Sequence, residues 1–377
     1  QRPYFRLFAG LLHEFNSLDQ AFDSYTIPIL HQFSQLFHHF QPSAYPGFTF
    51  AWLELISHRM FMPKLLREQK GWAVMQQLLV ELFTYLEPHL RNVKLSPPIR
   101  LLYKGSLRVL LVMLHDFPEF LCDYHFSLCT VIPSNCIQMR NLILSAYPRT
   151  MKLPDPFTPN LKVDLLPEIK EPPRIYSNFV GVFTDIAMMR TLDNYLKTGE
   201  PASFLPELVT KLQLTSPEQI NARGTKYNVP LINGLVLYVG MKALSEPSVH
   251  PYGEITAAAA MEIFRTLATQ LDTEGRYWLF SAIANQLRYP NNHTHYFSRL
   301  LLFLFAETQL EIVQEQITRV LFERLITQRP HPWGLLITFI ELIKNNHYNF
   351  WDRSFIRCAP EIERLFVQVN HSISRQG

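Results

Sequence analysis

The chain of 377 residues has room for two or three domains, or for one elongated domain. Its 35 Lys and Arg and 32 Asp and Glu leave a formal charge of +3, which is too small to indicate a nucleic-acid or membrane partner. Hydrophobic residues make up 47% and charged residues 18%, so the chain can bury a large core and is not disordered. The 27 prolines and only 13 glycines favour helices separated by prolines over phosphate-binding loops and tight hairpins.

Apolar residues recur at helical spacing throughout the N-terminal half of the sequence. The Ser96-Pro97 pair is typical of a helix start, and the helix after it is so apolar that it must be largely buried. Pro88 lies beyond the expected end of the preceding helix, which is predicted at residues 72–86. The helices predicted in this half cover residues 4–15, 33–40, 50–61, a short stretch from 63, and then 72–86, 99–114, 119–130 and 134–147.

A proline-rich stretch interrupts the helices in the middle of the chain. Seven prolines between residues 147 and 173 exclude a regular helix there, and irregular segments of this length in compact proteins are functional or linking. We therefore expect an N-terminal HEAT-like part at residues 1–147, an ordered connector at 148–173 and a C-terminal HEAT-like part at 174–377. Phe157 and Leu161 are the expected anchors of the connector, and a disordered linker is the alternative.

Helical patterns resume after the connector and are separated by short polar or proline turns. They cover residues 183–196, 204–212, 231–244, 261–271, 277–287, 293–307, 310–327, 332–344 and 360–369, while residues 215–226 form a polar patch typical of a surface loop. About sixteen to eighteen helices stacked in antiparallel pairs describe an all-α solenoid of the HEAT type. No strict repeat signature is present, so a pair of irregular helical bundles is the structural alternative.

The sequence offers no convincing catalytic or metal-binding pattern. Cys122, Cys129 and Cys136 are seven residues apart, unlike the close pairs of zinc sites, and with Cys358 they are expected to be buried thiols. His293 and His295 are two residues apart and do not share a helical face. No nucleotide-binding glycine motif or nucleophile elbow is found. We therefore predict no enzymatic activity, no metal and no cofactor.

Nucleic-acid and membrane functions are also disfavoured. The arginines between residues 288 and 329 are interleaved with glutamates, which is typical of a solvated helix face and not of a phosphate-binding stripe. Direct RNA binding by a helical repeat remains the alternative function. The longest apolar runs, at 231–243 and 300–306, are shorter than the ~18 to 20 residues that span a bilayer. With no signal peptide at the start, we expect a soluble intracellular protein.

Protein binding remains as the predicted function, because solenoids offer long surfaces for extended peptides and helices. The turn between two strongly apolar helices carries hydrogen-bonding and aromatic groups suited to recognition. The candidate partner-binding residues are Tyr289, Asn291, His293 and Tyr296, with Phe157 in the connector. The alternative is that Tyr289 and Tyr296 pack inward while His293 caps the next helix.

Several long strings of the sequence resemble one known family in the family's own order. They are AWLELISHR (51–59), YKGSLRVLL (103–111), HDFPEFLCDY (115–124), LPDPFTPNLKV (153–163), LDTEGRY (271–277), IANQLRYP (283–290) and RPHPWGLLITFIELI (329–343). Together they resemble the C-terminal superfamily homology domain of the Not scaffold, the largest subunit of the Ccr–Not mRNA deadenylase complex. Residues 215–226 and 246–258 match the family least and are similar to its variable loops.

The resemblance implies a HEAT-like scaffold without catalysis of its own, cut from a much longer protein. In the family this domain holds two other Not-type subunits as a heterodimer, whose extended N-terminal segments wrap around it. It also receives short linear motifs of mRNA-binding repressors. The implied roles are in mRNA deadenylation, decay, translational repression, RNA-mediated gene silencing and transcription regulation. The implied location is the cytoplasm, including mRNA-processing bodies, and the nucleus.

Overall fold

The computed structural model describes residues 1–17, 25–91, 94–245, 259–357, 364 and 367. Throughout these residues the regular structure is helical, and the only strand-like pairing within them is one isolated bridge between Gln213 and Tyr227. The prediction of an all-α fold is confirmed. No helix in the described part of the chain is both long enough and apolar enough to cross a lipid bilayer.

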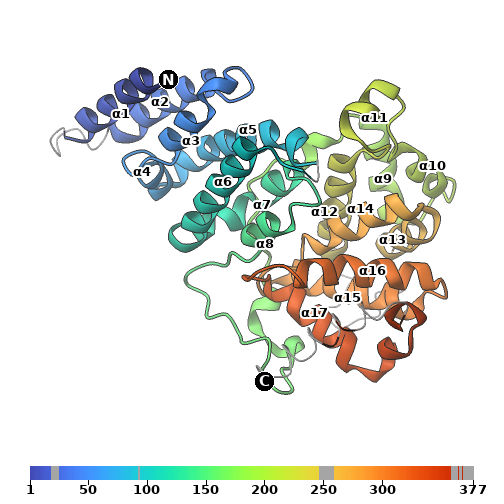
Figure 1. Cartoon of the computed structure of the whole chain (residues 1–377). Coiled ribbons are helices and arrows are strands. Elements are labelled where there is room, and N and C mark those ends of the chain that lie inside the picture. Colours follow the sequence, from blue (N-terminus) through green and yellow to red (C-terminus); the bar gives the residue numbers. More distant parts are fainter. Residues whose placement is uncertain (18–24, 92–93, 246–258, 358–363, 365–366, 368–377) are drawn as a thin grey trace. The chain divides into compact units, whose positions relative to one another are not determined.

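The helices form two compact units, coloured from blue to red along the chain in Figure 1. Unit 1 contains Gln1–Ile143 and Ile175–Ser177, and unit 2 contains Leu144–Arg174 and Asn178–Gly377. The proline-rich connector at 148–173 therefore belongs to unit 2 over its whole length. The three-part division at residues 147 and 173 stays a prediction.

Unit 1 is a stack of helices in two layers. Its helices are α1 (Arg2–Asn16), α2 (Thr26–His39), α3 (Thr49–Ile56), α4 (Met62–Arg67), α5 (Trp72–Leu90), α6 (Pro97–Asp116), α7 (Pro118–Val131) and α8 (Ile137–Leu144). One layer holds α1, α3 and α6 in order, and the other holds α2, α5 and α7. Gly105 allows α6 to approach α3 closely, because a Cβ atom there would lie 2.9 Å from the Leu53 side chain. Such stacked layers are the HEAT-like arrangement that the sequence predicted.

Unit 2 repeats the two-layer plan. It contains α9 (Ile186–Thr198), α10 (Phe204–Lys211), α11 (Pro217–Arg223), α12 (Val229–Ser245), α13 (Ala259–Gln270), α14 (Thr273–Ala284), α15 (Asn292–Glu307), α16 (Glu311–Leu325) and α17 (Trp333–Lys344). The helices α12, α14 and α16 pack in sequence as one layer, and α13, α15 and α17 pack as the other. Their apolar faces share one continuous core.

Two of the differences between the predicted and the observed elements have local causes. Helix α5 continues through Pro88 to Leu90, because a proline in the last turn removes only one backbone hydrogen bond before the helix ends. The polar patch at 215–226 is not a simple loop, since it contains α11. Ser216 caps this helix by accepting a hydrogen bond from the Gln219 amide, and Gly224 ends it with a φ of 64°. The predicted helix at 360–369, Cys358 and the variable segment 246–258 lie outside the described residues, apart from the isolated residues 364 and 367.

Candidate protein-binding surface

The first half of the connector is attached to α17 of unit 2. The indole Nε1 of Trp333 donates a hydrogen bond to the Pro154 carbonyl oxygen at 2.8 Å. The partly buried ring of Phe157 packs against the core of the unit, and its amide donates to the Asp155 carboxylate at 3.0 Å. The proline-rich backbone, which cannot form a helix here, is thus held by one side-chain hydrogen bond and one aromatic anchor.

The second half of the connector lies along the start of α15. Its two short 3-10 turns are η4 (Val163–Leu165) and η5 (Pro167–Lys170), and η5 packs directly against α15. The Asp164 carboxylate lies 2.8 Å from His295 Nε2, and the Glu171 carbonyl accepts a hydrogen bond from the Asn292 amide at 3.0 Å. Ile169 of η5 is buried. The connector therefore covers the turn that precedes α15.

Four of the candidate partner-binding residues lie in this covered region, Tyr289 and Asn291 in the turn and His293 and Tyr296 in α15, and all four side chains are buried. Tyr289, Asn291, His293 and Tyr296 expose 7%, 2%, 4% and 4% of their surface. The side chain of Asn291 caps α15 by accepting a hydrogen bond from the Thr294 amide at 2.9 Å. The expectation that this turn displays its side chains is corrected, and Asn291, not His293, is the cap.

The turn is buried because the connector and α17 both pack against it. Besides the connector, α17 contributes the Gly334 amide, which donates to the Arg288 carbonyl at 2.6 Å. The hydroxyl of Thr294 donates to the carbonyl oxygens of Gln286 and Tyr289 at 3.0 and 2.9 Å, and accepts a bond from the Arg288 amide. Burial, and then the charge of Arg288, lower the pKa of His293 to about 3, so its imidazole is neutral.

Sequence reasoning missed Thr294 and Gly334, the residues that organise this turn. An added Cβ at Gly334 would lie 2.4 Å from the Thr294 methyl group and 2.9 Å from the Arg288 carbonyl oxygen, so only glycine fits there. An Asn directly before a helix, as at Asn291, is a local N-cap signal that could have been recognised. The close approach of α17 had no local signal.

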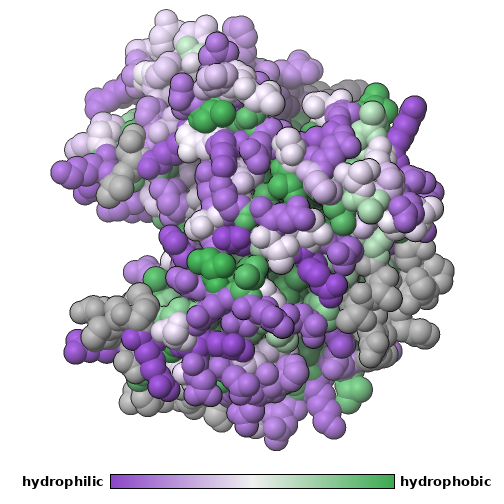
Figure 2. Space-filling view, turned by 90° about the vertical axis from the view of Figure 1, so that its right-hand side faces the viewer, coloured by the Kyte–Doolittle hydropathy of each residue, from purple (hydrophilic) through white to green (hydrophobic). Residues whose placement is uncertain are grey.

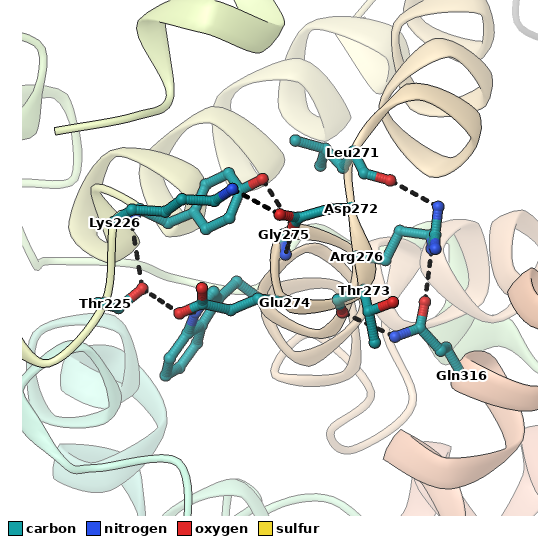
Figure 3. A network of polar contacts seen from close by, with 11 residues as sticks. Thr225, Lys226, Leu271, Asp272, Thr273, Glu274, Gly275, Arg276 and Gln316 are labelled. Carbon is teal, nitrogen blue, oxygen red and sulfur yellow. Dashed lines mark hydrogen bonds and ion pairs between the residues drawn. The ribbon is translucent and has the colours of Figure 1, made fainter. Parts of the chain in front are cut away.

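A second polar network joins the segment before α12 to the start of α14 (Figure 3). Asp272 caps α14 at the Gly275 amide, forms an ion pair with Lys226 at 2.6 Å and accepts a hydrogen bond from the Tyr227 hydroxyl at 2.9 Å. Burial alone would raise the pKa of Asp272, but the bonds from Lys226, Gly275 and Tyr227 outweigh it and lower the pKa to about 2. The carboxylate is therefore charged, and its contacts hold the segment at Lys226 and Tyr227 against the start of α14.

The network continues to α16 through Arg276, whose guanidinium donates to the Gln316 side chain and the Leu271 carbonyl, both at 2.5 Å (Figure 3). Gln316 in turn donates to the Thr273 carbonyl at 2.7 Å. The LDTEGRY string is thus a set of packing and capping contacts between helices. Within the described residues no group of three His, Cys, Asp or Glu side chains is placed to hold a metal ion.

The remaining surface carries exposed apolar side chains in separate places. On the face drawn in Figure 2, hydrophobic side chains form small patches within a mostly hydrophilic surface. In unit 1 the layer of α1, α3 and α6 exposes a set of large apolar residues: Tyr4, Leu7, Leu11, Phe50, Leu101, Leu111 and Val112. In unit 2 the connector exposes 71% of Leu165. These side chains are available to a partner, unlike those of the buried turn.

Comparison with known proteins gives one consistent family. Residues 12–370 match the family model described as "CCR4-Not complex component, Not1". The chain is 48% identical over 392 residues to the CCR4-NOT transcription complex subunit let-711 of Caenorhabditis elegans, covering 100% of this chain and 15% of that protein. It is 36% identical over 385 residues to the general negative regulator of transcription subunit 1 of Schizosaccharomyces pombe, covering 99% and 18%. The chain thus spans less than a fifth of the curated relatives that it matches.

Two solved structures share the fold over nearly the whole chain. The NOT1 superfamily homology domain from Chaetomium thermophilum superposes with a TM-score of 0.88 at 32% identity, covering 99% of this chain and 75% of that one. A Not1 C-terminal domain in complex with Not4 superposes with a TM-score of 0.81 at 29% identity, covering 96% and 76%.

Proposed function

The chain belongs to the Not1 family of CCR4-Not complex components, and from this we propose that it is a non-catalytic scaffold domain on which other subunits dock. The observation that carries the proposal is the match, over 96% of the chain, to a Not1 C-terminal domain in complex with Not4. The exposed apolar side chains of α1, α3 and α6 support it, because they offer area for a partner to cover.

The partners that we propose are the two other Not-type subunits, bound as a heterodimer through their extended N-terminal segments. Short linear motifs of mRNA-binding repressors are the second proposed class. Docking of the repressor motifs would bring the deadenylase to target mRNAs, and the scaffold would so support deadenylation, decay and translational repression in the cytoplasm and nucleus. Extended segments suit layered helices, because a peptide can follow the groove between neighbouring helices.

The region of Tyr289, Asn291, His293, Tyr296 and Phe157 stays a proposed contact. Since these side chains are buried or partly buried, the partner would meet the connector segment that covers them and not the side chains themselves. The exposed Leu165, next to the Asp164–His295 pair, is the apolar group that such a contact would cover.

Calorimetry and gel filtration with the N-terminal regions of the two Not-type subunits test the docking role. We expect a stable complex, low-micromolar or tighter, and a negative heat-capacity change because apolar surface is buried. Absence of both heat and a co-eluting complex would refute the assignment.

Direct RNA binding is the alternative function, and the exposed cations of α6 are the observation in its favour. A phosphate-driven complex loses affinity steeply with salt, with a log–log slope close to the number of phosphates contacted. Titrating a labelled oligouridylate from low to physiological salt therefore separates this alternative from protein docking.

A further inference from the structure

Helix α6 exposes a broad face to solvent, so the expectation that this helix is largely buried is wrong. Its buried residues, Leu102, Ser106, Val109, Leu110 and Met113, pack into unit 1. Helical spacing places the following exposed side chains on the opposite side: Arg100, Leu101, Lys104, Arg108, Leu111, Val112 and His115. We call these seven residues the α6 face. The exposed fractions of Leu101, Leu111 and Val112, at 58%, 48% and 43%, are high for aliphatic side chains of an otherwise well-packed helix.

The charge of the α6 face is of one sign. From Pro97 to His115 the helix contains three cations and no carboxylate, and Asp116 at its end is already paired with His115 at 2.8 Å. No ion pair within the described residues joins Arg100, Lys104 or Arg108 to an acidic group. Helix α16 differs, because Glu311 and Glu315 are exposed on it together with the cation Arg319, while Arg324 is buried.

The spacing of the cations defines what would complement them. Arg100, Lys104 and Arg108 are four residues apart, which places neighbouring charges about 6 Å from each other along the helix axis. Carboxylates at every fourth residue of a helix have the same spacing, and those at every second residue of an extended segment lie about 7 Å apart. A segment with either pattern can pair with all three cations while its apolar residues cover Leu101, Leu111 and Val112.

We propose that the α6 face receives an acidic, aliphatic-bearing segment of a protein partner. This rests on the docking function proposed above and names the chemistry of one docked segment. Carboxylates of the segment pair with Arg100, Lys104 and Arg108, and its Leu-type side chains pack on the three exposed aliphatic residues. The apolar contacts supply area removed from water, and the ion pairs set the register and speed the encounter.

The same face is poorly suited to RNA. Single-stranded RNA is bound by stacking its bases on aromatic rings, and the exposed residues of α6 include no Phe, Tyr or Trp. The only aromatic residue of the helix, Tyr103, is largely withdrawn from solvent, and burial raises the pKa of its hydroxyl to about 12. Exposed leucine and valine match a protein segment better than a sugar–phosphate chain.

The test compares the whole chain with two charge-reversed variants. The first carries Arg100→Glu, Lys104→Glu and Arg108→Glu. The control carries Arg190→Glu, Lys197→Glu and Arg223→Glu, which reverses three exposed cations of α9 and α11 and changes the net charge equally. The first probe is a fluorescein-labelled designed peptide with Glu at every fourth position and Leu beside it. A peptide with Lys in place of Glu is its charge control, and both are followed by fluorescence anisotropy at several salt concentrations.

We expect the Glu peptide to bind the wild-type chain and the control variant alike, and to bind the α6 variant at least about tenfold more weakly, with a smaller salt dependence. Equal binding of the Glu peptide to all three chains, or no binding to any, would overturn the proposal. So would equal binding of the Lys peptide and the Glu peptide to the wild type. Circular dichroism would show that the α6 variant keeps its helices, since the changed side chains are exposed.

Two further titrations separate this proposal from the docking function itself. If the Not-type subunit pair binds the wild type while the Glu peptide does not, only the α6 proposal fails. If the Glu peptide binds as expected and the subunit pair does not, the docking function fails and the α6 face stands. If the α6 variant no longer bound a labelled oligouridylate while its binding of the Glu peptide were unchanged, the α6 face would be assigned to RNA instead.

Discussion

Replacing Gly334 by alanine tests the close approach of α17 to the buried turn. An added Cβ would lie 2.4 Å from the Thr294 methyl group and 2.9 Å from both the Arg288 carbonyl oxygen and the Leu287 carbonyl carbon. Two of these atoms belong to the backbone, so relief requires α17 to move away from the corner between α14 and α15. Such a shift also weakens the 2.6 Å hydrogen bond from the Gly334 amide to Arg288.

The expected cost follows from these contacts. Overpacking costs about 1–3 kcal/mol and the weakened hydrogen bond about 1 kcal/mol, while alanine recovers up to about 1 kcal/mol of helix propensity. The net loss is about 2 kcal/mol, which lowers the melting temperature of a unit of this size by about 4–8 °C. Differential scanning calorimetry measures this shift.

Gly10 in α1 provides the matched control. A Cβ at Gly10 would meet nothing within 4 Å, so Gly10→Ala should be neutral or stabilise by up to about 1 kcal/mol. If Gly334→Ala melted at or above the wild-type temperature while Gly10→Ala behaved as expected, the close contact between α17 and the turn would be refuted.

Three further predictions concern the same unit. The lowered pKa of Asp272 means that its carboxylate stabilises the fold at pH values above its ordinary pKa of 3.8, and that this contribution is lost as the pH falls towards about 2. Because the side chain is half exposed, Asp272→Asn should lower the free energy of unfolding by only about 1 kcal/mol above pH 4. It should also make the free energy of unfolding fall less steeply as the pH is lowered from 4 to 2. An unchanged steepness would contradict this. Phe157→Ala should lower the free energy of unfolding by about 2 kcal/mol, less than for a fully buried ring, and should make the connector susceptible to trypsin. Rapid cleavage of the connector in the wild-type chain would show that the connector is not held against unit 2. Tyr289→Ala with His293→Ala should lower the melting temperature strongly and leave affinity for the Not-type pair unchanged; the reverse pattern would show a directly contacted surface.

Helix positions were predictable because their signals are local. The Ser96-Pro97 start and the apolar periodicity predicted α6 over residues 99–114, and the structure has it at Pro97–Asp116. Apolar periodicity reflects residues three or four apart, and a first-turn proline is favoured by its own fixed φ and missing N–H, so both can be recognised without knowledge of the fold. The sequence predicted that α14 begins at residue 277, four residues after its observed start at Thr273. Gly275 is typical of a turn unless the Asp272 cap and the packing of Tyr227 against Gly275 are known.

The family resemblance was also contained in the sequence, since its strings extend over nearly the whole chain and the family model matches residues 12–370. Composition alone did not distinguish a helix from a loop in the polar patch at 215–226. A short polar helix differs from a loop mainly by its capping residues, here Ser216 and Gly224. Both of these signals were present and were not recognised.

The burial of the candidate site was decided only by the tertiary structure. Tyr289, Asn291, His293 and Tyr296 have the composition of a recognition surface, but the connector reaches them from far away in the sequence, as the Asp164–His295 contact shows. By contrast, the charge pattern of α6 was readable in the sequence, while its outward orientation depends on the packing of α6 against α3 and α7. Sequence periodicity determines which residues share a helical face, and only long-range packing determines whether that face meets solvent or another part of the chain.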